Sequence, residues 1–144
     1  MTKSKYRRQV AALPVRRIKG ELQVLMITSR RSGRWLIPKG WPMQRRTAAE
    51  AAAQEALEEA GVVGKVTSRP RGRYHYIKVF DDQTAAPCMV DVFVMKAVKQ
   101  RDKWREKNVR KRRWMNLSRA ARSAHEHGLA DLLRQFARKP YSDA

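Results

Sequence analysis

The sequence predicts a single α+β domain in which helices and a β-sheet pack as the layers of a sandwich. Strand-like runs lie on both sides of one Ala- and Glu-rich helical segment, and a second helical region closes the chain. The length of 144 residues suits one domain, and the 42% of hydrophobic residues can form its core. We expect the domain over 9–138, between a basic, flexible N-terminus at 1–8 and a tail at 139–144.

The first half of the chain begins with strand-like segments. Residues 9–19 and 22–28 contain β-branched and other apolar residues and flank a tight turn at Gly20, which predicts a β-hairpin. Residues 35–37 are a short apolar run that a proline stops. The Gly and Pro residues of 39–46 then predict an irregular loop.

The strongest helix signal covers residues 48–60, which are almost all Ala, Leu, Glu and Gln. Thr47 precedes this segment as an N-cap, and Glu50 lies three residues later, at the spacing of a capping box. Gly61 follows as the terminating residue. The sequence therefore predicts one helix with both ends defined.

Strand-like segments return after this helix, at 64–79 and 88–98, and the second is β-branched and aromatic. Nine basic and two acidic side chains crowd residues 99–113. This composition predicts a charged loop that leads into a short strand over 112–117.

The C-terminal region predicts two helices. Ser118 is positioned to cap a helix over 119–127, and Gly128 is expected to break it. An amphipathic helix over 129–138 follows. Its apolar side chains fall at core spacing, at Leu129, Leu132, Leu133 and Phe136.

The charge balance points to a polyanionic partner. Lys and Arg number 33 against 13 Asp and Glu, which gives a formal net charge of +20. Mutual repulsion among so many positive charges destabilises a fold, so such a balance is typical of proteins that bind polyanions. Nucleic acid, an anionic membrane surface and a phosphate-rich small molecule all fit, and a merely basic, soluble surface is the alternative.

Several classes of protein are excluded. No apolar run approaches the ~20 residues of a membrane span, and the basic N-terminus lacks the apolar core of a signal peptide. The single cysteine, Cys88, excludes an internal disulfide framework and a cysteine zinc cluster. We therefore expect a cytoplasmic protein without membrane association.

Three carboxylates are concentrated near the end of the predicted helix. Glu55, Glu58 and Glu59 fall on one helical face, where they repel one another, and two of them lie in the last turn, where the helix dipole disfavours negative charge. A bound Mg²⁺ or Mn²⁺ would offset this repulsion, since hard cations take carboxylate oxygens. The alternative is a solvated acidic face, or one paired with basic side chains.

The residues from Gly40 onward resemble the Nudix box, G-x5-E-x7-R-E-U-x-E-E-x-G-U, in which U is an apolar residue. The positions that match in register are Gly40, Glu55, Glu58, Glu59, Gly61 and Val62. The resemblance implies a Nudix-type α/β/α sandwich with a mixed β-sheet between helices. Two positions depart from the pattern, because Arg46 replaces the first Glu and Gln54 replaces the Arg.

The resemblance also implies a reaction, the hydrolysis of a diphosphate linkage with Mg²⁺ or Mn²⁺ as cofactor. Glu55 and Glu59 are assigned as the principal metal ligands, and Glu58 as a further ligand or as the base that activates water. All three are therefore catalytic candidates. The carbonyl of Gly40 is expected to add another ligand.

Three short segments resemble the branch that hydrolyses diphosphoinositol polyphosphates and also diadenosine polyphosphates. They are residues 28–35, 38–40 and 110–114. Such substrates need a pocket rimmed by cations, and Arg suits that rim because its planar guanidinium binds phosphate bidentately. The cations placed by position to bind this polyanionic substrate are Arg8, Arg17, Arg30, Arg34, Lys39, Arg46 and Lys111. Trp41 is the aromatic expected on the ligand side.

Two other functions remain open. The chain could hydrolyse nucleotides or an RNA 5′ end, with the basic stretch 99–113 following the nucleic-acid backbone. It could instead be a non-catalytic module that binds a polyanion. The departures at Arg46 and Gln54 favour the second alternative, whereas the three retained glutamates favour an enzyme.

Overall fold

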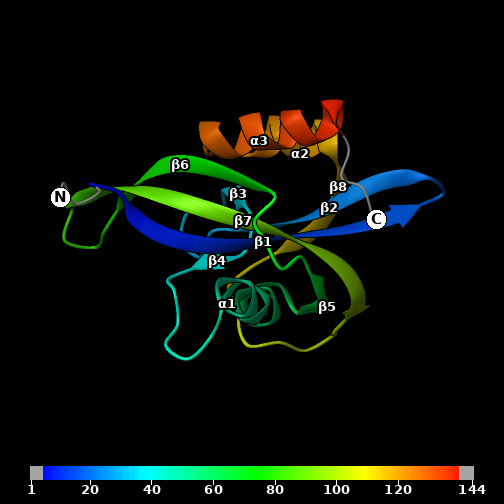
Figure 1. The fold of residues 1–144 in the computed structure, drawn as a ribbon, viewed down its shortest axis with the longest axis horizontal. Helices are drawn as coiled ribbons and strands as arrows, with labels where there is room; N and C mark the ends of the chain where they lie inside the picture. Colours follow the sequence, from blue (N-terminus) through cyan, green and yellow to red (C-terminus); the bar gives the residue numbers. More distant parts are fainter. Residues whose placement is uncertain (1–4, 140–144) are drawn as a thin grey trace.

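A computed structural model describes residues 5–139. One mixed eight-stranded sheet is covered by α1 on one face and by α2 and α3 on the other (Figure 1). The predicted α+β sandwich with a mixed sheet between helices is confirmed. The predictions for residues 1–4 and 140–144 lie outside the described residues, and Arg7 and Arg8 belong to the first strand.

The first strand organises the sheet. β1 (Arg7–Ile18) forms an antiparallel hairpin with β2 (Glu21–Thr28). Lys19 and Gly20 make the turn with φ of 51° and 82°, the left-handed pair that a tight hairpin needs. On its other edge β1 runs parallel to β7 (Ala85–Gln100), and this pairing makes the sheet mixed.

The remaining strands extend this centre. The sheet runs in the order β3-β2-β1-β7-β5, with β4 paired to β1, β6 to β7 and β8 to β2. The bounds of these strands are β3 (Trp35–Leu36), β4 (Lys39–Gly40), β5 (Val62–Val66), β6 (Gly72–Val79) and β8 (Arg112–Asn116). β4 lies inside the predicted loop 39–46, and its pairing with β1 fixes the place of Gly40.

The predicted strand 64–79 is wrong as a single element. β5 and β6 pair with successive halves of the long strand β7, and residues 67–71 leave the sheet between them. Pro70 lies in this break, and proline has no N–H for a sheet ladder. Residues 67–71 are polar or basic apart from Pro70, and Gly72 follows them, so the sequence did mark this break and the single predicted strand ran across it.

The helix predicted over 48–60 has a regular first part. In α1 (Ala48–Glu55) the side chain of Thr47 accepts from the Glu50 N–H at 3.1 Å, and the Glu50 carboxylate accepts from the Thr47 N–H at 2.8 Å. The predicted capping box is confirmed.

The last turn of this helix is a π turn. The chain continues from α1 as η1 (Ala56–Ala60) and ends at Gly61 with φ of 68°, so the predicted end at Gly61 is confirmed. The Gly61 N–H faces the carbonyl of Ala56, five residues earlier, as well as that of Leu57.

The C-terminal helices also begin elsewhere than predicted. α2 (Leu117–Ser123) starts two residues earlier than 119, and its cap is Asn116, whose side chain accepts from the Arg119 N–H at 2.8 Å. Ser118 is therefore inside the helix and does not cap it.

Gly128 does not break a helix, because α3 (His127–Arg138) runs through it. A Cβ at this position would lie 2.5 Å from the backbone oxygen of His75 on β6. Glycine is thus required here by the close approach of the helix to the sheet, and its low helix propensity is overridden.

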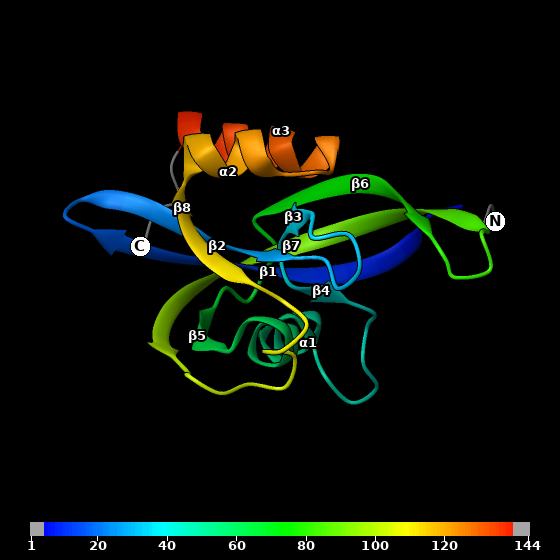
Figure 2. The same cartoon turned by 180° about the vertical axis from the view of Figure 1, so that it is seen from behind.

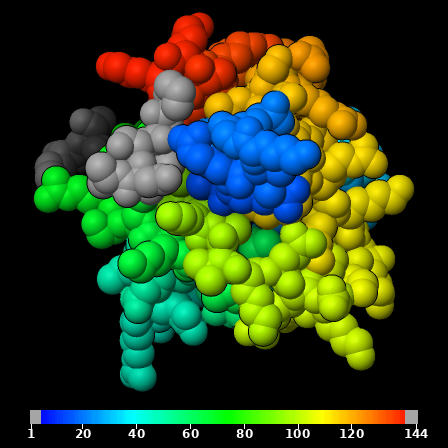
Figure 3. All heavy atoms as spheres, turned by 90° about the vertical axis from the view of Figure 1, so that its right-hand side faces the viewer, coloured from blue at the N-terminus to red at the C-terminus, as the bar shows by residue number. Residues whose placement is uncertain are grey.

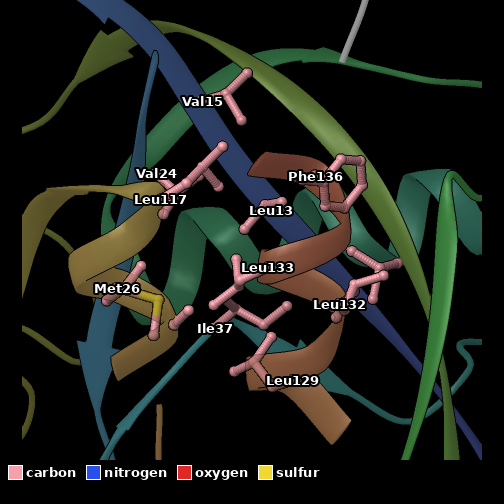
Figure 4. Packing of buried hydrophobic residues seen from close by; sticks show 14 of the residues in the cluster. Leu13, Val15, Val24, Met26, Ile37, Leu117, Leu129, Leu132, Leu133 and Phe136 are labelled. Carbon is pink, nitrogen blue, oxygen red and sulfur yellow. The ribbon is translucent and has the colours of Figure 1, made fainter. Parts of the chain in front are cut away.

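Two hydrophobic cores lie on the two faces of the sheet. The predicted apolar side chains of α3 meet Leu13 and Ile37 under α2 and α3, as Figure 4 shows for Leu129, Leu132 and Leu133. The opposite core packs the alanines of α1 against Val10, Ala12, Leu25 and Phe93. Alternation along β1 sends Ala12 and Leu13 into different cores.

The β1–β2 hairpin extends past the layers, and Figure 3 shows it in blue, nearest the viewer. No helix among residues 5–139 is both long and apolar enough to cross a bilayer.

Candidate active site

Two of the three predicted carboxylates come together near the end of the helix. Glu55 and Glu59 are four positions apart, so they are neighbours on one side of it. Each carboxyl group lies close enough to the other to shift its pKa. They line one hollow of about 370 Å³ together with Gly40, and we call it the carboxylate hollow.

The burial of this pair changes its protonation. Glu59 is only 7% exposed, and burial, followed by the hydrogen bond that a protonated Glu59 donates to Glu55, raises the pKa of Glu59 to about 8. Burial also raises the pKa of Glu55. Two adjacent carboxylates out of water cannot both hold a negative charge without a cation, so the pair shares a proton at neutral pH.

Gly40 is required by its distance to the pair. A Cβ at Gly40 would lie 2.5 Å from the carboxyl carbon of Glu55, so no other residue allows this approach. On the other side of the pair, the N–H of Lys39 faces Oε1 of Glu59 at 3.3 Å. The pairing of β4 with β1 holds both backbone groups in place.

These groups fit a hard divalent cation. Their donors are carboxylate oxygens beside a backbone strand, the ligand type that Mg²⁺ and Mn²⁺ prefer. Among the described residues, no three acidic, His or Cys side chains converge into a closed metal cage. Mg²⁺ does not need one, because it is usually held by one or two carboxylates and completes its shell with water and substrate phosphate.

Glu58 turns away from the other two glutamates. Its carboxylate pairs with Arg105, and it does not line the carboxylate hollow. Its negative charge still acts on the pair, because after burial it helps to raise the pKa of Glu55.

Residues 101–111, yellow in Figure 2, run around the end of the helix to β8 and satisfy the carbonyls of the π turn. The last carbonyls of any helix lack partners within it. Each is met here by a separate donor: the Glu106 N–H to Glu58 O (3.1 Å), the Trp104 Nε1–H to Glu59 O (3.1 Å), and Arg112 Nη1 to Ala60 O (2.9 Å). The Arg112 guanidinium also stacks on the Trp104 ring at 3.8 Å.

Arg110 is a site residue that sequence reasoning missed. Its Nη2 lies 3.7 Å from Oε2 of Glu59, its Nε donates to Glu106 at 3.0 Å, and its Nη1 donates to the Thr28 carbonyl at 2.9 Å. Its side chain is buried. It belongs to a run of four basic residues, 110–113, and nothing in that run distinguishes it from the predicted Lys111.

The predicted cations divide into two groups. Arg30 and Lys39 line the carboxylate hollow, together with Trp41 and with Lys78, which the sequence did not single out. Lys111 shares a neighbouring hollow with Arg30, and Arg34 lines a third that also contains Lys39.

Three predicted cations do not line these hollows. Arg46 lies beside Glu50 and Gln54 at a separate hollow of about 250 Å³. Arg17 belongs to the projecting hairpin, where it pairs with Leu22 in register. Arg8 is exposed on β1, at the start of the sheet.

Comparison with known proteins agrees with this geometry. Residues 5–136 match the NUDIX domain model. In *Arabidopsis thaliana*, the chain is 30% identical over 121 residues to Nudix hydrolase 12, mitochondrial, covering 82% of this chain and 60% of that protein. It is 32% identical over 118 residues to Nudix hydrolase 17, mitochondrial, covering 81% and 62%. The chain thus spans about three fifths of the length of these relatives.

Solved structures share the fold. A *C. elegans* Ap4A hydrolase superposes with a TM-score of 0.68 at 20% identity, covering 94% of this chain and 99% of that one. The NUDIX domain of *Shewanella oneidensis* NrtR, complexed with ADP ribose, superposes with a TM-score of 0.71 at 13% identity, covering 96% and 91%. With the domain match over almost its whole length, the chain belongs to the Nudix family.

Proposed function

We propose that this chain is a Mg²⁺- or Mn²⁺-dependent hydrolase that cleaves a diphosphate linkage in a highly phosphorylated small molecule, of the diphosphoinositol polyphosphate or diadenosine polyphosphate type. The observation that carries the proposal is the buried Glu55–Glu59 pair beside Gly40, in a hollow rimmed by cations. The names of the relatives and neighbours support it, since they include Nudix hydrolases and an Ap4A hydrolase.

The glutamates and Gly40 would bind the cation and assist the attack of water. Glu55 and Glu59 would hold the cation, with the Gly40 carbonyl as a further ligand. The bound cation would offset charge on the phosphate oxygens while water attacks in line. Glu58, at the same turn, would serve as the further ligand or the base only after its ion pair with Arg105 opens and its side chain turns to the hollow.

Substrate binding falls to the cations around the hollow. Arg30, Lys39 and Lys78 line it and would bind non-bridging phosphate oxygens, with Arg110 at its floor. Arg34 and Lys111 extend this basic surface into the neighbouring hollows. Arg8, Arg17 and Arg46 lie elsewhere, so the proposed site leaves them out.

The test is a phosphate-release panel in the presence of Mg²⁺. It includes diphosphoinositol polyphosphates, diadenosine polyphosphates, ADP-ribose and nucleoside triphosphates. Glu59→Gln should abolish release, whereas Glu21→Gln, a matched change on the exposed hairpin, should not. Full activity in Glu59→Gln, or no release from any diphosphate, would refute the proposal.

A nucleotide or an RNA 5′ end is the second candidate substrate, favoured by the net charge of +20. A protein that binds along a nucleic acid loses affinity steeply as salt rises. On single strands, the logarithm of the binding constant falls against the logarithm of the salt concentration with a slope of about −0.7 per neutralised phosphate. Tight, metal-free RNA binding without phosphate release would instead select a non-catalytic binding module.

A further inference from the structure

Lys39 lines two adjoining hollows. One is the carboxylate hollow, and the other, of about 590 Å³, is the hollow that Arg34 lines. The backbone N–H of Lys39 faces Oε1 of Glu59 at 3.3 Å, so its side chain starts beside the proposed cation site. This side chain therefore forms part of the wall that the two hollows share.

The side chain of Lys39 is held in place. It is only 12% exposed, whereas that of Arg30 in the same hollow is 66% exposed. Its Nζ lies 3.4 Å from Oε2 of Glu126 and 4.8 Å from the ring centre of Tyr76. A lysine stem is flexible, and its ammonium group carries three donors. These two contacts restrict the stem, and the hydrogen bond to Glu126 uses one donor and leaves others for a ligand.

Glu126 is itself fixed by the packing of α3 on β6. It is the N-cap residue of α3, yet its side chain makes no capping bond and turns to Lys39 instead. A Cβ at Gly128 would lie 2.5 Å from the backbone oxygen of His75, so the start of the helix lies directly on β6. The carboxylate of Glu126 is therefore presented to Lys39 from a rigid position.

The second oxygen of this carboxylate is enclosed by the core. Neither Oε1 of Glu126 nor the hydroxyl of Tyr74 is open to solvent. Burial, and after it the nearby charge of Glu126, raises the pKa of Tyr74, so this hydroxyl stays protonated beside the carboxylate. One oxygen of Glu126 thus faces the core, and the other is left for Lys39.

Stability alone does not account for this ion pair. Taking two charges out of water costs free energy, and a buried pair is often no more stabilising than two apolar side chains of similar size. The pair joins residues 87 positions apart at the edge of the proposed active site. A role in substrate binding accounts for both its burial and its place.

We propose that Glu126 is a positioning residue, which holds the ammonium group of Lys39 where it binds a phosphate oxygen of the diphosphate at the carboxylate hollow. Glu126 acts through Lys39 and does not itself line that hollow. The inference rests on the proposed function for the place of the diphosphate. It adds a residue that belongs neither to the Nudix-box pattern nor to the cations around the hollow.

The test compares two substitutions of Glu126 at a fixed Mg²⁺ concentration. The probe is methylenediphosphonate, a diphosphate analogue whose P–C–P link cannot be hydrolysed, and its Kd is measured by calorimetry. Glu126→Gln and Glu126→Met both remove the negative charge, but only glutamine keeps an oxygen that accepts from Lys39. Glu126→Met should therefore bind the probe about tenfold more weakly than Glu126→Gln, the effect of losing one hydrogen bond to a charged group.

Lys39→Met shows whether Glu126 acts through this lysine. When it is combined with each change at Glu126, the difference in Kd between the two chains should vanish, because no ammonium group remains to be held. None of these variants leaves a buried carboxylate of Glu126 unpaired or removes a capping bond, so they should fold, which a thermal melt checks.

Asp91 provides the matched control. It pairs with Arg73 at 2.7 Å and lines neither hollow. Asp91→Asn and Asp91→Leu also differ in whether an acceptor remains for the partner cation. These two variants should bind the probe alike.

The role of Glu126 is disproved if the parent chain does not bind the probe, if Glu126→Gln and Glu126→Met bind it alike, if their difference persists with Lys39→Met, or if the Asp91 variants differ as much. Phosphate release by the parent chain with equal Kd values for the two Glu126 variants would keep the proposed function and remove this role. If no diphosphate is hydrolysed but the difference appears and depends on Lys39, the proposed function fails and the positioning role stands.

Discussion

The indole Nε1–H of Trp104 donates to the backbone carbonyl of Glu59 over 3.1 Å. This bond joins the loop between β7 and β8 to the residue at the centre of the carboxylate hollow. Gly61 lies directly under the same indole, since a Cβ there would approach its Cδ2 to 2.7 Å. Trp104 does not line the carboxylate hollow, so it acts as a positioning residue for the π turn.

Trp104→Phe should weaken cation binding more than substrate binding. Phenylalanine keeps a ring for Arg112 to stack on, but it leaves the Glu59 carbonyl without its donor, a loss of about 1–3 kcal/mol. We expect the Mg²⁺ concentration for half-maximal activity to rise about tenfold, with KM unchanged. Trp114→Phe, which loses an indole bond to Gln100, is the control and should leave the Mg²⁺ requirement as it is. A rise in KM alone would contradict this role.

Gly40→Ala should abolish the cation site while the domain stays folded. The new methyl group would overlap the Glu55 carboxyl group, whose side chain must then leave the hollow. Mg²⁺ titration followed by calorimetry should show no binding. Gly20→Ala strains the hairpin turn, where φ is 82°, and should lower Tm without changing Mg²⁺ affinity. Normal affinity in Gly40→Ala would exclude Gly40 from the site.

Arg110→Met should destabilise the fold, since it leaves Glu106 and Glu59 partly buried without their cation. Breaking a buried pair costs about 3–5 kcal/mol, and the side chains of Arg110 and Glu59, taken without their backbone, are each about 10% exposed. The double variant Arg110→Met, Glu106→Gln should recover part of this loss, as measured by urea unfolding. Strict additivity of the two single effects would show that the residues are not coupled.

Glu50→Gln should change how stability depends on pH. The hydrogen bonds from Thr47 lower the pKa of Glu50, so its charged form favours the folded state. The stabilisation by the charged carboxylate is fully present when the pH is above the ordinary carboxyl pKa. It is lost as the pH falls through the lowered pKa of Glu50 in the folded state. Parent and variant should therefore differ in Tm at pH 7 and converge below about pH 4. A gap that stays constant down to pH 3 would rule out titration of Glu50 as its cause.

Local features of the chain could be predicted because they depend only on residues that are close together in the sequence. The capping box of Thr47 and Glu50 spans three residues, and the heptad-like spacing on α3 depends only on helical period. The resemblance carried by Gly40 and Glu55 likewise follows from their spacing in the chain. The break between β5 and β6 is marked locally as well, by Pro70 among the polar residues 67–71, and the prediction of one strand over 64–79 ran across that signal.

The sequence by itself determined that three glutamates would end a capped helix after Gly40, within a strongly basic α+β domain. Only the tertiary structure decided which carboxylates meet. Trp104 and Arg112 donate to the carbonyls of the π turn, and Glu58 turns to Arg105, which leaves Glu55 and Glu59 as the pair that lines the hollow. These bonds join residues some 45 to 52 positions apart, so no local period encodes them.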